Sequence, residues 1–129
     1  MSTSRFRLVL AGLAATGALA AGAHTVEAKS ITQLGTSCTA GTPAYMVYLS
    51  SGSKVTVGFG SNSVASLGRW HVVVSDNGTP MLDHTLNATV PAWSVSTSRT
   101  LTKGSHTLAL QATNLTNGEV CTQTVFNKV

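Results

Sequence analysis

The amino-acid sequence predicts an all-β fold, a sandwich of two antiparallel sheets, on two observations. Apolar and polar residues alternate along short segments, as in residues 107–113, where Leu108, Leu110 and Ala112 share one face. Turn-forming residues separate these segments, and residues 29–129 contain no segment with helical periodicity. We therefore expect a single domain of about seven or eight short antiparallel strands.

The N-terminus has the pattern of a bacterial signal peptide. Arg5 and Arg7 precede an uncharged run rich in Ala and Gly, and small-residue patterns allow cleavage after Ala23 or after Ala28. Such a run inserts weakly as a membrane anchor, so we expect its removal and no stable membrane span in the mature chain. These observations assign residues 1–28 to the signal peptide and residues 29–129 to one secreted or periplasmic domain.

The elements of this domain follow in order along the chain. A first strand is expected near residues 31–38, followed by a hairpin of two strands near residues 45–49 and 55–59. Val55, Val57 and Phe59 form the inward row of that hairpin. A loop of small residues then leads to residue 68.

The next strand, residues 69–76, places Trp70, Val72 and Val74 on one face, and we expect Trp70 in the core. Asn77-Gly78 favours the positive φ angles of a tight hairpin, so residues 81–86 should return beside this strand. Beyond Pro91, one face of residues 93–101 carries only hydroxyl side chains at residues 94, 96, 98 and 100, and we expect that face in solvent.

Both cysteines lie in the domain, and an even number in an exported protein favours a disulfide. A bond between Cys38 and Cys121 joins positions 83 residues apart. In the chain-entropy description such a loop contributes roughly 4 to 5 kcal/mol to stability. It would also connect the first strand region to the last.

The charge pattern argues against a nucleic-acid partner. The whole chain has 8 Lys and Arg residues against 4 Asp and Glu residues, but the basic residues are scattered singly. Nucleic-acid binding proteins more often cluster basic residues and intersperse them with aromatic ones. The high pI therefore reflects the scarcity of acidic residues.

Residues 101–112, LTKGSHTLALQA, followed by Gly118-Glu119-Val120, resemble the C-terminal half of bacterial immunoglobulin-like and fibronectin-III-like domains. The resemblance implies an immunoglobulin-like β-sandwich and makes His106 a structural corner residue rather than a ligand. Such domains usually serve as adhesion, spacer or recognition modules.

The functional hypothesis is binding, adhesion or assembly at the cell surface or in the extracellular space, because the sequence lacks the common catalytic motifs. We therefore do not expect an enzyme. Tyr48 and Trp93 are candidate ligand-binding residues, since exposed aromatic rings stack on sugars; the alternative is that the two sheets bury both rings. A protein or a carbohydrate could be the surface ligand.

The alternative is a copper-binding β-sandwich, and otherwise no cofactor is expected. Cleavage after Ala23 would make His24 the N-terminal residue, whose amine and imidazole could chelate Cu(II) with help from Asp83 and His84, or from His71. Cleavage after Ala28 would remove His24.

Overall fold

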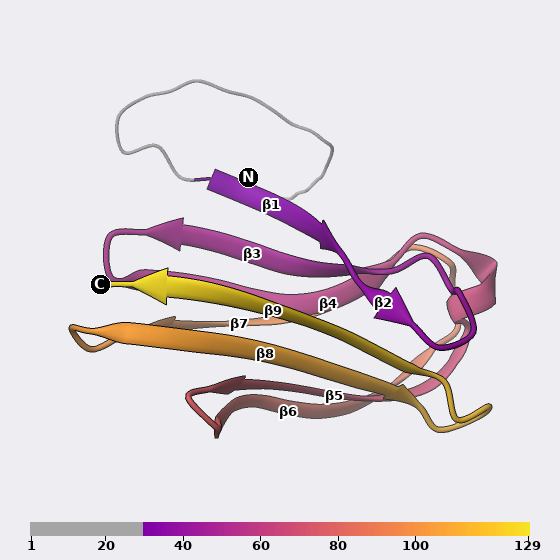
Figure 1. Ribbon diagram of the computed structural model, residues 1–129. Coiled ribbons are helices and arrows are strands. Elements are labelled where there is room, and N and C mark those ends of the chain that lie inside the picture. Colours follow the sequence, from indigo (N-terminus) through magenta and orange to yellow (C-terminus); the bar gives the residue numbers. More distant parts are fainter. Residues whose placement is uncertain (1–29) are drawn as a thin grey trace.

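The computed structural model describes residues 30–129, which form two antiparallel sheets packed face to face (Figure 1). The four-stranded sheet has the order β1 (Ser30–Gly35), β3 (Tyr45–Ser51), β4 (Lys54–Ser61) and β7 (Trp93–Thr100). The five-stranded sheet has the order β2 (Ser37–Cys38), β9 (Val120–Lys128), β8 (Ser105–Asn114), β5 (Gly68–Asp76) and β6 (Thr79–Ala88). One short 3-10 helix, η1 (Val64–Ser66), follows β4.

These two sheets confirm the predicted all-β sandwich. The expected first strand is two strands, because β1 pairs with β3 in one sheet whereas β2 pairs with β9 in the other. This crossing near Thr36 raises the strand count to nine and lets one short segment join both sheets. The predicted signal peptide, residues 1–28, lies outside the described residues, and within residues 30–129 no helix has the length and apolar character needed to cross a bilayer.

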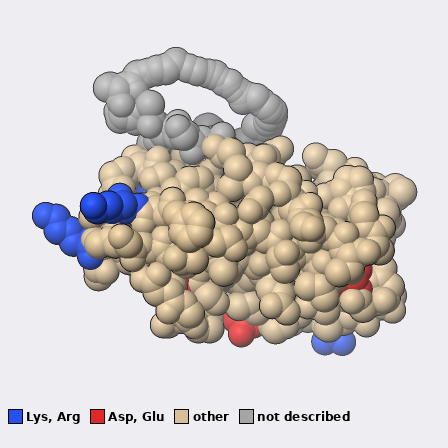
Figure 2. Space-filling view, viewed as in Figure 1, with Lys and Arg blue, Asp and Glu red and all other residues tan. Residues whose placement is uncertain are grey.

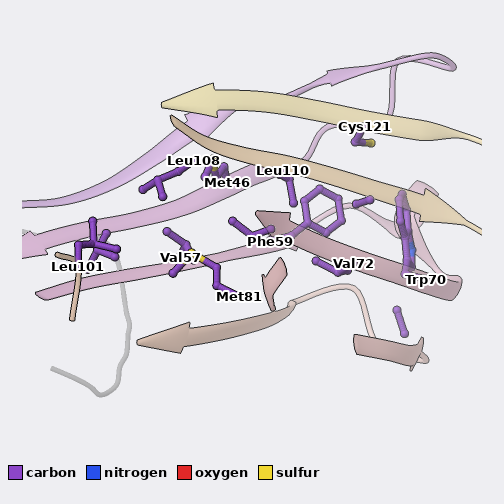
Figure 3. Packing of buried hydrophobic residues seen from close by; sticks show 14 residues of the cluster. Met46, Val57, Phe59, Trp70, Val72, Met81, Leu101, Leu108, Leu110 and Cys121 are labelled. Carbon is purple, nitrogen blue, oxygen red and sulfur yellow. The ribbon is translucent and has the colours of Figure 1, made fainter. Parts of the chain in front are cut away.

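The core lies between the sheets and includes the inward rows that the alternation predicted, together with Met46 and Met81, which it did not assign to the core (Figure 3). Val55, Val57 and Phe59 from β4 face the predicted row of β5, and Trp70 is completely buried. The rings of Phe59 and Trp70 are 5.1 Å apart between centroids. The predicted hydroxyl face of β7 lies outward and is exposed at residues 94, 96, 98 and 100.

The predicted Asn77-Gly78 hairpin joins β5 to β6, and both residues have positive φ angles, 49° and 88°. The Asn77 side chain also binds the neighbouring strand: its Oδ1 accepts from the Thr107 N–H at 2.8 Å, and its Nδ2 donates to the Ser105 carbonyl at 3.1 Å. Asn77 therefore ties this turn to β8.

The antiparallel order divides the connections between two ends of the sandwich. One end, which we call the disulfide end, carries residues 36–44, 62–67, 89–92 and 115–119. The other, which we call the lysine end because Lys54, Lys103 and Lys128 lie there, carries the turns at residues 52–53, 77–78 and 101–104. In Figure 2 blue side chains gather at this second end, on the left of the view.

Candidate binding groove

The outer face of the five-stranded sheet forms a half-open groove with a volume of about 420 Å³. Its lining comes from β5, β8 and β9 and is mainly hydroxyl, amide and imidazole groups over small apolar residues: His71, Val73, Ser75, Ala109, Leu110, Gln111, Thr113, Thr122 and Thr124. A groove with this lining offers many neutral hydrogen-bonding groups.

Strand register explains why residues so far apart in the chain share this surface. Val73 lies opposite Gln111, and Gln111 lies opposite Thr122. In the next row on the same face, Ala109 lies between Ser75 and Thr124. Directly paired residues of an antiparallel sheet point to the same face, so three strands contribute to one surface.

One ion pair borders the groove. His71 Nε2 and Asp83 Oδ1 are 2.7 Å apart, and their side chains are 40 % and 60 % exposed. Asp83 pairs in register with Val73, so it stands beside the groove floor and orients the imidazole. Within residues 30–129 the other ring nitrogen of His71 has no hydrogen-bond partner, so it can exchange a hydrogen bond with a ligand or with water.

Phe126 extends this surface with an apolar ring. It is 80 % exposed, the most exposed large apolar side chain among residues 30–129. It shares the outward face of β9 with Thr122 and Thr124, because Cys121 points inward and strand residues alternate. Phe126 is not among the residues predicted from the sequence to bind a ligand, although its outward orientation follows from Cys121 by counting along β9.

The predicted aromatic ligand-binding residues lie elsewhere. Tyr48 pairs with Val57 and Trp93 pairs with Ser61, so both side chains lie on the inward face of the four-stranded sheet. Both rings pack against the core; Tyr48 Oη accepts from Asn127 Nδ2, and Trp93 Nε1 donates to Ser66 Oγ at 2.9 Å. Both rings are therefore partly buried, as in the alternative in which the sheets cover them, because pairing with the inward row of β4 turns them inward.

Of the copper ligands suggested by the sequence, Asp83 and His84 lie on opposite faces of β6. Asp83 pairs with Val73 on the outward face, whereas His84 pairs with the buried Val72. Asp83 contacts His71 instead, and His24 lies outside the described residues. Within residues 30–129, the His, Cys, Asp and Glu side chains that converge within 4.8 Å are Cys38, Glu119 and Cys121, and both sulfur atoms are joined to each other.

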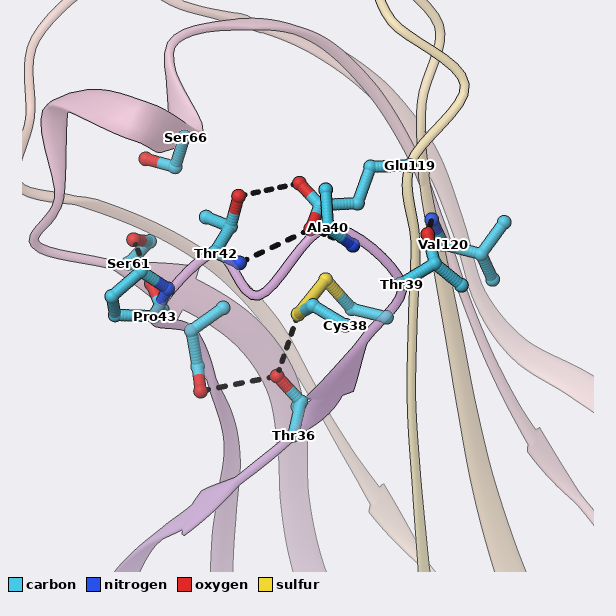
Figure 4. The surroundings of a disulfide bond; sticks show 12 residues. Thr36, Cys38, Thr39, Ala40, Thr42, Pro43, Ser61, Ser66, Glu119 and Val120 are labelled. Atoms are coloured by element: carbon cyan, nitrogen blue, oxygen red, sulfur yellow. Dashed lines mark hydrogen bonds between the residues drawn. A yellow bond between two sulfur atoms is a disulfide. The ribbon is translucent and has the colours of Figure 1, made fainter.

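The predicted disulfide is present: Cys38 and Cys121 are bonded and face each other across β2 and β9 (Figure 4). Beside them lies Glu119, which is only 3 % exposed. Its Oε2 accepts from the N–H groups of Ala40 and Thr42 at 2.9 and 3.1 Å, and its Oε1 accepts from the Thr42 hydroxyl. Burial raises the pKa of Glu119, but these hydrogen bonds outweigh it and hold the pKa below its ordinary value.

His106 occupies a comparable position at the lysine end and is 6 % exposed. Its Nε2 lies 2.7 Å from the Thr102 carbonyl oxygen, and its Nδ1 lies 2.7 Å from Asp76 Oδ1. Both partners are acceptors, so this arrangement favours the doubly protonated imidazolium. The hydrogen bond to Thr102, followed by that to Asp76, raises the pKa of His106. His106 thus joins two turns, the corner role that the sequence resemblance implied.

The fold and site define a β-sandwich that is closed by one disulfide and carries a polar groove on the outer face of its larger sheet. No family profile matches the chain, and no curated protein or solved structure matches it either. The function must therefore be inferred from the groove itself.

Proposed function

We propose that this protein is an exported, non-catalytic binding module that holds an extended carbohydrate in the groove of its five-stranded sheet. The supporting observation is the combination, on one face, of neutral hydrogen-bonding side chains with the freely exposed ring of Phe126. The disulfide and the signal-peptide pattern are compatible with work outside the reducing cytosol.

Carbohydrate recognition suits this chemistry because a sugar presents hydroxyl groups at its edges and C–H groups on its ring faces. The amide of Gln111 and the hydroxyls of Thr113 and Thr122 can exchange hydrogen bonds with sugar hydroxyls. The exposed ring of Phe126 can stack on the apolar face of a sugar ring, at a low cost in conformational entropy. The groove is half-open, so a chain of sugars can enter it from solvent.

Part of the strand order supports a module of immunoglobulin-like type. In such domains the last strands and the third lie side by side in one sheet, and here β9, β8 and β5 are neighbours in the same way. The other sheet differs: β4 follows β3 through a tight hairpin, whereas an immunoglobulin chain crosses to the opposite sheet after its second strand. We propose the likeness for the groove-bearing sheet only.

Binding to an array of oligosaccharides and to insoluble polysaccharides tests the proposal. We expect retention of at least one glycan, and at least a tenfold loss of its affinity in Phe126→Ala and in Gln111→Ala, as is typical when a stacking or buried polar contact is removed.

The matched control is Leu115→Ala. Leu115 is also an exposed apolar residue, at 50 %, but it lies in a loop of the disulfide end rather than on the groove face. Equal losses in Phe126→Ala and Leu115→Ala, or no glycan retained by the wild-type protein, would contradict the proposed site.

A further inference from the structure

We infer that the carbohydrate of this groove is acidic, and that Lys128 and Lys103 bind its anionic groups where the groove face reaches the lysine end. This inference rests on the proposed function and names the charge class of its ligand. It follows from the continuation of the groove-bearing strand beyond Phe126.

The face of β9 that lines the groove continues to a lysine. Thr122, Thr124, Phe126 and Lys128 alternate with inward residues, so all four point to the outer side of the sheet. Residues two apart on a strand are separated by roughly 7 Å, close to the length of one sugar unit. A sugar stacked on Phe126 therefore places its neighbour beside Lys128.

Lys103 adds a second positive charge next to this position. Lys128 lies opposite Ser105, and the backbones of Gly104 and Val129 exchange two hydrogen bonds of 3.0 and 2.9 Å. These bonds extend the pairing of β8 and β9 to the turn that carries Lys103. Both lysines are exposed, so their ammonium groups are free to meet a ligand.

Each acidic side chain of residues 30–129 is already engaged by another group, including Asp76 at the lysine end. Glu119 is buried at the disulfide end, Asp76 is bonded to His106, and Asp83 is bonded to His71. Within residues 30–129 the ion pairs join His71 to Asp83 and His106 to Asp76, so neither lysine is paired with a carboxylate side chain. The lysine end thus offers positive charge to carboxylate, phosphate or sulfate groups on a polymer.

The experiment compares dextran with carboxymethyl-dextran, which share a backbone and differ in charge. We expect the wild-type protein to bind carboxymethyl-dextran more tightly and to lose that preference between low and high salt. The double variant Lys103→Gln, Lys128→Gln should lose roughly 3- to 10-fold in affinity for the charged polymer and little for dextran. Lys54→Gln is the matched control, because Lys54 lies at the same end but on the other sheet.

The outcomes separate the inference from the function on which it rests. Equal binding of both polymers, with a loss in Phe126→Ala, overturns the acidic ligand and leaves carbohydrate binding intact. Binding of polyglutamate as tight as that of carboxymethyl-dextran, unaffected by Phe126→Ala, overturns both, since any polyanion would then suffice. Equal losses in the double variant and in Lys54→Gln also overturn the assignment of these two lysines.

Discussion

The two ends of the sandwich use the same device with opposite charge. At the disulfide end, the buried carboxylate of Glu119 holds residues 40–42 through donors of the backbone and of Thr42. At the lysine end, the buried imidazole of His106 holds Thr102 and Asp76 through acceptors. In each case one buried ionisable side chain fixes a connection to the sheet through its hydrogen bonds.

The difference between the ends lies in which pH change weakens each. The lowered pKa of Glu119 keeps its carboxylate charged to a lower pH than an ordinary Glu, whereas the raised pKa of His106 keeps its imidazolium charged to a higher pH than an ordinary His. Only the disulfide end also has a covalent bond. Acid should therefore weaken the disulfide end and alkali the lysine end. The covalent bond protects only the disulfide end.

Removal of the disulfide should have the largest effect. Cys38→Ser combined with Cys121→Ser releases an 83-residue loop, and we expect the free energy of unfolding to fall by about 4 kcal/mol. Urea titration measures this loss, and the wild-type protein in dithiothreitol is the matched control because its sequence is unchanged. After removal of the disulfide, amide hydrogen exchange should accelerate at residues 39–42 before it does at residues 102–106. Simultaneous loss of exchange protection at both ends would show that the two ends do not unfold independently.

Loss of the Glu119 carboxylate should rank second. Glu119→Ala leaves the N–H groups of Ala40 and Thr42 without their acceptor, which should cost about 2 to 3 kcal/mol. In the wild-type protein this contribution is complete above the ordinary pKa of 4.5 and is lost as the pH falls through the lower folded value. Denaturation at several acidic pH values checks this, with exposed Asp83→Asn as the control; equal acid sensitivity in both variants would refute the role of Glu119.

Loss of the His106 imidazolium should have the smallest effect, because its partner Asp76 is 23 % exposed and can be hydrated instead. The folded pKa lies above the ordinary value of 6.5, so the folded state holds the extra proton between the two values. Wild-type stability should therefore fall as the pH rises from 6.5 through the folded pKa, and His106→Gln should remove this dependence. His84→Gln, at an exposed histidine, should retain it. An NMR titration of the His106 ring protons in the wild-type protein checks the raised pKa of His106. A midpoint at or below pH 6.5 would contradict it.

Local patterns were sufficient for the core and the covalent bond. The inward rows of β4, β5 and β8 follow from alternation, and the Asn77-Gly78 turn follows from the conformations that these residues accept. The groove could not be predicted in this way, because it requires the register of β8 and β9 with β5, which is separated from them in the chain by β6 and β7.

Burial of Glu119 was also beyond local prediction. Asn117-Gly118-Glu119 has the composition of an exposed turn, and the groups that bury the carboxylate are 77 and 79 residues away. Tyr48 and Trp93 illustrate the same limit, since their inward direction depends on which residues of β4 they face. The outward direction of Phe126 could have been predicted from the sequence, because it follows from the inward direction of Cys121 by counting along one strand.

The crossing of the first strand between the sheets, together with the disulfide, also determines how the domain responds to tension. A force applied at Ser30 and Val129 can peel residues up to Cys38 and residues beyond Cys121, but the chain between the two cysteines stays in a closed loop. The peeled segments together lengthen by at most about 60 Å, whereas the reduced chain could extend to about 350 Å. Under load the oxidised domain is therefore a short tether. Peeling beyond Cys121 removes the β9 residues Thr122, Thr124 and Phe126 from the groove face, whereas β5 and β8 stay paired within the closed loop.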